Sequence, residues 1–290
     1  KIVDYDDLPL FLASGSQNAD VTAELIWVGS GTEAELKGKD LTGKICFSSG
    51  SLRNLATMMK RGALGLVSFE NSRALNDPLQ IPSGGMRSRG SNTVKGFAFR
   101  VTARDGWVLR DRLIRGEKIE VHAEVEATNV ELDVQVPTCV IEGTDPEGEE
   151  IIMSAHIFEG CVKQGANDNI SGSAALLDMV RVLKTLYDEG RLERPKRSIR
   201  FIWVPEFSGT IPWVNAHPEL MKKTLCNINM DMVGLKIAEN LSAFNLHRTT
   251  MGNPHYINDV VACYMRYVGE NNKASLTPIS RDLFRKPIVA

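Results

Sequence analysis

The strongest constraint on the fold is a nearly continuous apolar segment, Ser198–Val204, in the second half of the chain. A strand has this composition when other elements cover both of its faces. Two further strands are predicted at Glu149–Ala155 and Cys226–Met232, and the apolar spacing of Ser171–Tyr187 predicts a long helix. Buried strands that alternate with helices predict an α/β fold built on a doubly wound mixed sheet.

The first half of the chain has shorter predicted elements, which together indicate a second, smaller α/β domain. We therefore expect three parts. They are an N-terminal segment over residues 1–20, able to pack on the larger domain, a small domain over 21–130, and the larger domain itself over 131–290, incomplete at its C-terminal side.

Composition excludes several classes of protein. The net charge is −2 and no basic stripe is present, which argues against a nucleic-acid binder. No apolar run approaches the ~20 residues that cross a bilayer, so we expect no membrane span. The five cysteines form no CxxC pair, which argues against a disulfide framework or a structural zinc knuckle, and four of them are expected in the core: Cys46, Cys139, Cys226 and Cys263.

Four polar side chains lie at related places in the larger domain. His156 directly follows one predicted strand, Glu206 follows the next, Asp231 is near the end of the last, and Asp168 lies in the loop before the long helix. Ligands of open α/β sheets bind beyond the carboxyl ends of the strands. One His and two Asp are a suitable ligand set for a catalytic zinc, and a nearby Glu is a suitable proton acceptor.

Each of these residues also has an ordinary structural interpretation when taken alone. Asp168 is well placed to interact with a helix dipole, and His156 and Glu206 are common types of loop residue. Asp231 is harder to explain this way, because a carboxylate in an otherwise apolar strand is costly unless it is paired or metal-bound. The combination of all four favours the metal site.

Three motifs contain or adjoin these residues. Gly165–Gly172 reads GANDNISG, Arg200–Glu206 reads RFIWVPE, and Asn229–Gly234 reads NMDMVG. Together with His156 they resemble the bacterial leucine-aminopeptidase family, whose fold is shared by glutamate carboxypeptidase, glutaminyl cyclase and the transferrin receptor. The resemblance covers about residues 134–234. It implies that His156, Asp168 and Asp231 hold zinc, with the Asp168 position bridging to a second metal, and that Glu206 is the general base.

The smaller domain resembles a protease-associated domain, a module often placed before this peptidase domain. The segments that carry this resemblance are Val28–Thr32, Leu41–Ile45 and Gly62–Val67.

The sequence departs from the family pattern at several positions. Phe207 stands where the family has a second Glu that binds the second metal, so we expect one zinc ion rather than two. Phe158 replaces an Asp that steadies the site, and Glu159 and Cys161 are the candidate accessory residues. The last ligand of the family, a His, has no convincing counterpart after Asp231.

The resulting hypothesis is a metal-dependent exopeptidase of aminopeptidase type, which hydrolyses peptide substrates at their ends through a zinc-bound water. The alternative is a non-catalytic, receptor-like or binding protein on the same fold with a degenerate metal site. A third hypothesis is nucleotide binding at Gly29–Ala34, but the sequence lacks the acidic residue expected after the next strand. The sequence also has no GxSxG element, which argues against a serine hydrolase. Relatives are often exported, which favours a secreted or periplasmic location. The sequence does not indicate the oligomeric state.

Overall fold

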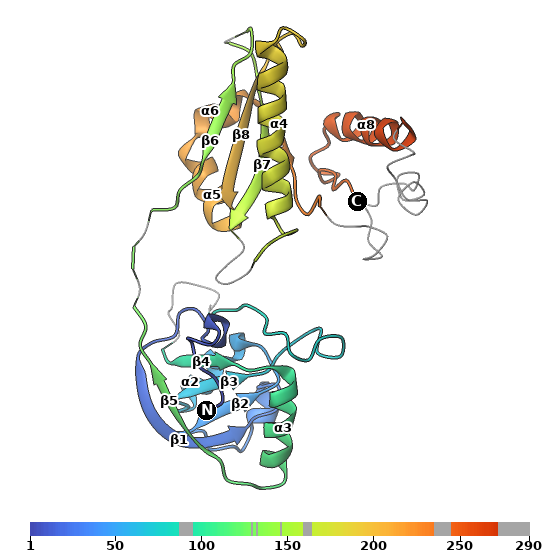
Figure 1. Cartoon of the computed structure of the whole chain (residues 1–290). Coiled ribbons are helices and arrows are strands. Elements are labelled where there is room, and N and C mark those ends of the chain that lie inside the picture. Colours follow the sequence, from blue (N-terminus) through green and yellow to red (C-terminus); the bar gives the residue numbers. More distant parts are fainter. Residues whose placement is uncertain are drawn as a thin grey trace. The chain divides into compact units, whose positions relative to one another are not determined.

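The computed structural model describes residues 1–86, 95–128, 130–131, 133–145, 147–158, 164–234 and 245–271. The chain forms two compact units that divide near residue 132. Each unit contains one sheet with helices packed against it (Figure 1). Within the described residues, no helix combines the length and the apolar character that a bilayer span requires.

The first unit contains a five-stranded sheet in the order β4-β3-β2-β1-β5. Strands β1 to β4 are parallel to their neighbours, and β5 is antiparallel to β1 at the edge. The strands are β1 (Ala19–Trp27), β2 (Ile45–Ser48), β3 (Gly65–Ser68), β4 (Phe97–Arg100) and β5 (Glu120–Val125). The helical elements are η1 (Pro9–Phe11), α1 (Glu33–Leu36), η2 (Leu52–Asn54), α2 (Leu55–Lys60) and α3 (Ala103–Ile114).

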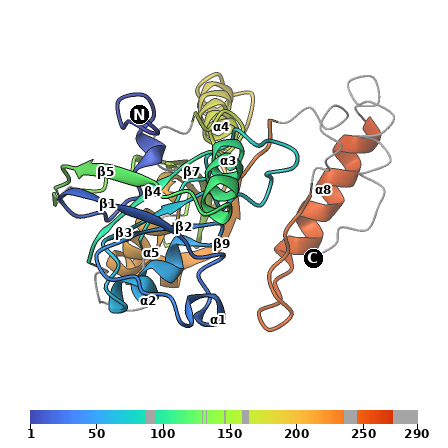
Figure 2. The same ribbon diagram turned by 90° about the horizontal axis from the view of Figure 1, so that it is seen from below.

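Both faces of this sheet are covered. Leu55 and Met58 of α2 pack on one face, and Leu109 of α3 belongs to the core on the other, so the two helices lie on opposite sides of the sheet (Figure 2). Residues before β1 also contact this unit, since Leu12 forms a bridge with Phe99 and the amide of Ala13 donates to the Ala98 carbonyl at 2.9 Å.

The second unit contains a four-stranded sheet in the order β6-β8-β7-β9. Strands β7, β8 and β9 are parallel, and β6 is antiparallel to β8, which confirms the predicted α/β fold with a mixed sheet. The elements are β6 (Thr138–Ile141), β7 (Glu150–Phe158), α4 (Ile170–Asp188), β8 (Ser198–Pro205), α5 (Glu206–Ala216), α6 (Pro218–Lys223), β9 (Thr224–Asn229) and α8 (Ile257–Asn271).

Helices cover both faces of the second sheet because its central strand is apolar on both sides. Phe201 of β8 packs with Leu176 of α4, and the next residue, Ile202, packs in a core with Trp213 of α5 and Met221 of α6. Successive side chains of a strand point to opposite faces. The apolar segment that dominates the sequence is therefore the strand between two layers of helix.

Two predicted strand ends are wrong, and both changes affect the candidate site. β7 continues to Phe158 through an irregularity between His156 and Phe158, so His156 lies within the strand and not after it. β9 ends at Asn229, so Asp231 lies beyond the strand and its side chain is 42% exposed. The prediction that Cys263 belongs to the core is also wrong, because this residue is exposed on α8.

Candidate metal centre

Three of the predicted site residues come together in the second unit. His156 on β7 is 5% exposed, and its Nε2 atom lies 3.1 Å from Oδ1 of Asp168 and 3.7 Å from Oδ1 of Asp231. One potential ligand atom from each residue lies within 4.8 Å of the others, the only such group of His, Cys, Asp and Glu in the part of the chain that the structure describes. The predicted convergence of one imidazole and two carboxylates is therefore present.

Parallel pairing positions the imidazole. His156 pairs with Val204 of β8 near the carboxyl end of both strands, and its carbonyl accepts a hydrogen bond from Oγ of Ser173 on α4 at 3.0 Å. The backbone of His156 is therefore held between a strand and a helix. The two aspartates come from loops and are less enclosed, with side chains 44% exposed at Asp168 and 42% at Asp231.

A loop before α4 carries Asp168 and also organises the segment around Asp231. Asn169 is the N-cap of α4, and its Oδ1 accepts from the amides of Gly172 (3.1 Å) and Met232 (3.2 Å). Its Nδ2 donates to the Met230 carbonyl at 2.9 Å. Asn167 Oδ1 accepts from the Gly234 amide at 3.2 Å.

Sequence reasoning missed these two asparagines as contributors to the site. The available signal was their position on either side of Asp168 in the GANDNISG motif. An Asn that flanks a candidate ligand offers both a donor and an acceptor to nearby backbone.

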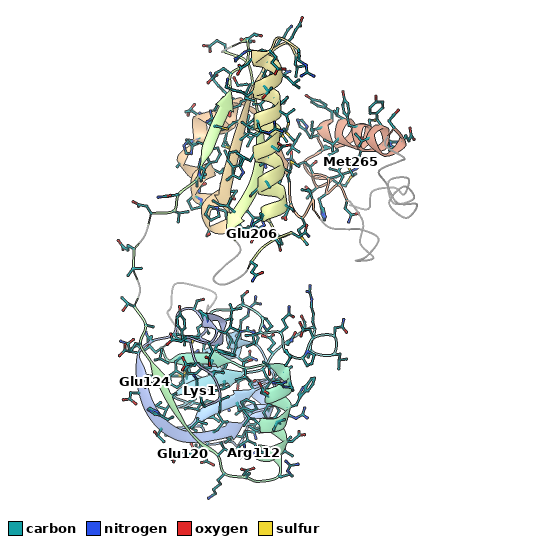
Figure 3. The ribbon with its side chains drawn as sticks, in the orientation of Figure 1. Lys1, Arg112, Glu120, Glu124, Glu206 and Met265 are labelled. Atoms are coloured by element: carbon teal, nitrogen blue, oxygen red, sulfur yellow. The ribbon has the colours of Figure 1, made fainter. Side chains whose placement is uncertain are left out.

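Glu206 is the first residue of α5, directly after Pro205 at the end of β8. Pro205 pairs with Phe158, two residues after His156, so Glu206 leaves the sheet at the same edge as the imidazole. Figure 3 shows Glu206 at the end of the second unit where β7 terminates. Its side chain is exposed.

The remaining predicted positions lie outside this donor group. Phe207 is 71% exposed and offers no ligand atom. Glu159 and Cys161 fall outside the described residues, so their predicted accessory role stays a prediction. His247 and His255 lie in the segment before α8 and do not belong to the group.

The glycine-containing loop after β1, which resembles a nucleotide fingerprint, is filled by a side chain of the protein itself. The Glu35 carboxylate accepts from the hydroxyl and amide of Ser30 at 2.6 and 3.0 Å, and from the hydroxyl and amide of Thr32 at 2.7 and 3.2 Å. These bonds, those from Ser30 first, lower the pKa of Glu35 to about 2. An internal anion therefore occupies the donors that a phosphate would need.

With this geometry established, comparison with known proteins defines the class. Residues 138–284, just over half of the chain, match peptidase family M28, and the chain belongs to that family. No curated protein matches the sequence.

Two similar solved structures are bacterial aminopeptidases. An aminopeptidase from Aneurinibacillus sp. strain AM-1 is 27% identical with a TM-score of 0.57, and the match covers 78% of this chain and 54% of that one. BSAP, a zinc aminopeptidase from Bacillus subtilis, is 22% identical with a TM-score of 0.68, and the match covers 91% of this chain and 60% of that one. The match thus takes in between about half and three fifths of each aminopeptidase.

Proposed function

We propose that this chain carries the zinc site of an exopeptidase of aminopeptidase type, which removes residues from the ends of peptides. The observation that carries the proposal is the convergence of His156, Asp168 and Asp231 within 4.8 Å in a chain of peptidase family M28. The position of this group at the carboxyl ends of the parallel strands β7, β8 and β9 supports it, since ligands of such folds bind there.

The donor set fits zinc. A catalytic zinc ion takes three protein ligands from His, Asp and Glu and keeps one position open. His156 Nε2, Asp168 and Asp231 would supply those three ligands, and Phe207 provides no fourth carboxylate beside Glu206, which supports one ion. When bound, zinc supplies Lewis-acid polarisation of the scissile carbonyl and lowers the pKa of water.

Glu206 is the proposed proton carrier. It lies at the same sheet edge as His156 and faces solvent, where an incoming peptide and a water molecule meet it. In hydrolysis the carboxylate takes a proton from the attacking water and delivers it to the nitrogen of the leaving amine as the C–N bond breaks. Glu206 alone therefore accepts and then donates the one proton that passes from water to the amine.

We further propose that the first unit is a protease-associated domain. It has a five-stranded mixed sheet, and the segments that carry the sequence resemblance lie in and beside its strands: Val28–Thr32 follows β1, Leu41–Ile45 leads into β2, and Gly62–Val67 leads into β3. The two compact units divide near residue 132, close to the boundary expected at 130.

The activity is tested on a panel of aminoacyl-anilides. We expect hydrolysis that a chelator abolishes and added zinc restores, and that falls by at least about 100-fold in Asp168→Asn because a ligand charge is lost. Asp178→Asn is the matched control, since Asp178 lies on the exposed surface of α4 beside Arg181. Hydrolysis that resists both the chelator and Asp168→Asn contradicts the proposal. Zinc binding without hydrolysis of any substrate contradicts the enzyme and favours the binding-protein alternative.

A further inference from the structure

We infer that Asn167 and Asn169 are positioning residues that set the spacing of the two aspartate metal ligands. The inference rests on the proposed zinc site and assigns a role to residues that do not themselves supply a ligand. It follows from the way in which two distant segments, Asn167–Asn169 and Met230–Gly234, are bonded to each other.

Each of the two aspartates lies inside one of the two bonded segments. Asp168 lies between Asn167 and Asn169, and Asp231 lies between Met230 and Met232. Asn169 binds the Met230 carbonyl with Nδ2 at 2.9 Å and the Met232 amide with Oδ1 at 3.2 Å. The backbone on both sides of Asp231 is therefore attached to the residue that follows Asp168.

Asn167 extends the contact by one further bond, because its Oδ1 accepts from the Gly234 amide at 3.2 Å. The start of α4, directly after Asn169, is also packed too closely against Met230–Gly234 for larger residues. A Cβ on Gly172 would lie 2.2 Å from the Met230 carbonyl oxygen, and one on Gly234 would lie 2.6 Å from Cβ of Ser171. Small residues and amide side chains together hold the two loops in contact.

The Asn169 contacts use both ends of an amide, because Nδ2 donates one bond and Oδ1 accepts two. The side chain must donate to a carbonyl and accept from an amide at once, which neither a carboxylate nor an apolar side chain can do. Asn169 is 3% exposed, so its bonds are shielded from competing water.

The consequence concerns metal affinity. Two carboxylates that face one site repel each other, and two unconnected loops would have to be ordered when the metal binds. The asparagine bonds join the Asp168 and Asp231 segments through side-chain amides and backbone groups, not through the carboxylates that would bind the metal. They therefore lower the entropy that metal binding would otherwise have to remove from the two loops. Groups that orient metal ligands typically change affinity by about 10–100-fold when they are removed.

The test measures binding of zinc alone and of cobalt(II) alone to the full chain and to Asn169→Ala and Asn167→Ala. We expect zinc affinity about 10–100-fold weaker in Asn169→Ala and a smaller loss in Asn167→Ala, which removes one backbone contact between the segments. The visible spectrum of bound cobalt(II) should change in both, because the ligand geometry changes. Asn229→Ala is the matched control, since Asn229 lies in the same region and its side chain, among the described residues, accepts from the Ser154 hydroxyl of β7 at 3.0 Å rather than bonding the loop that carries Asp168.

Weaker binding with an altered cobalt spectrum in the two variants, and neither in Asn229→Ala, supports the inference. Lower thermal stability with unchanged affinity and spectrum overturns it, because the asparagines would then serve only the fold. If Asn169→Ala does not fold, Asn167→Ala decides on the same criteria. Wild-type protein that binds neither metal overturns the zinc site and the inference with it, whereas wild-type binding with unchanged variants overturns the inference alone.

Discussion

Substitution of Gly172 by Ala separates helix propensity from the close packing of the two loops. Gly172 lies in the first turn of α4, where Ala is favoured over Gly by about 1 kcal/mol on propensity alone. The new Cβ would lie 2.2 Å from the Met230 carbonyl oxygen and 2.4 Å from Oδ1 of Asn169. Both atoms belong to the contact that positions Asp231.

The steric effect should exceed the propensity effect. A carbon and an oxygen cannot approach to 2.2 Å, so the backbone of Met230 must move by roughly 1 Å, and overpacking of this kind costs about 1–3 kcal/mol. The neighbouring atoms are a backbone carbonyl and a bonded amide, which places the cost in the upper half of that range. We expect Gly172→Ala to be about 1–2 kcal/mol less stable than the wild type, with zinc affinity reduced by about 10–100-fold.

Denaturant unfolding gives the stability, and competition with a chelating dye gives the zinc affinity. Ala174→Gly is the control for propensity, because Ala174 is exposed in the same region of α4. It should lose about 1 kcal/mol and keep its zinc affinity. A Gly172→Ala protein that is about 1 kcal/mol more stable than the wild type, with unchanged zinc affinity, would refute the close contact with Met230.

Three further outcomes are expected. Leu176→Ala should lower the free energy of unfolding by about 2–5 kcal/mol because Leu176 is fully buried on α4, whereas Leu177→Ala, 62% exposed, should change it by less than about 0.5 kcal/mol in the same denaturant experiment. Glu35 has a pKa of about 2 against an ordinary value of 4.5, so its contribution to stability is complete above pH 4.5 and lost as the pH falls toward 2. In Glu35→Gln the free energy of unfolding should depend less on pH between about 4.5 and 2. An unchanged slope would contradict the attribution of this pH dependence to Glu35. Glu206→Gln should lower kcat by about 100-fold or more with zinc content unchanged, and a wild-type kcat would remove Glu206 from the mechanism.

The layered architecture was predictable because it depends on patterns local to the sequence. The apolar segment of β8 and the helical spacing of α4 each report burial directly, and both elements were placed within about one residue of their observed ends. The predicted strands also placed the four site residues at or near the carboxyl ends of the strands. His156, Asp168 and Asp231 do converge as predicted.

The strand ends at the site were not predictable from local patterns. Met230 and Met232 alternate with polar residues as a strand does, yet β9 stops at Asn229 and Met232 has a φ of +54°. The reason lies 61 residues earlier in the chain, where Asn169 takes the backbone bonds that a continued strand would have used. Asp231 is consequently half-exposed rather than buried, and the cost of a buried carboxylate was the wrong reason for selecting it.

Anomalous diffraction at the zinc absorption edge, on crystals of the full chain grown with zinc, addresses the metal site directly. A single strong peak should appear about 2.0–2.2 Å from Nε2 of His156 and from carboxylate oxygens of Asp168 and Asp231. A zinc peak held by other residues, or no peak beside these three, would contradict the site and the peptidase chemistry assigned to it.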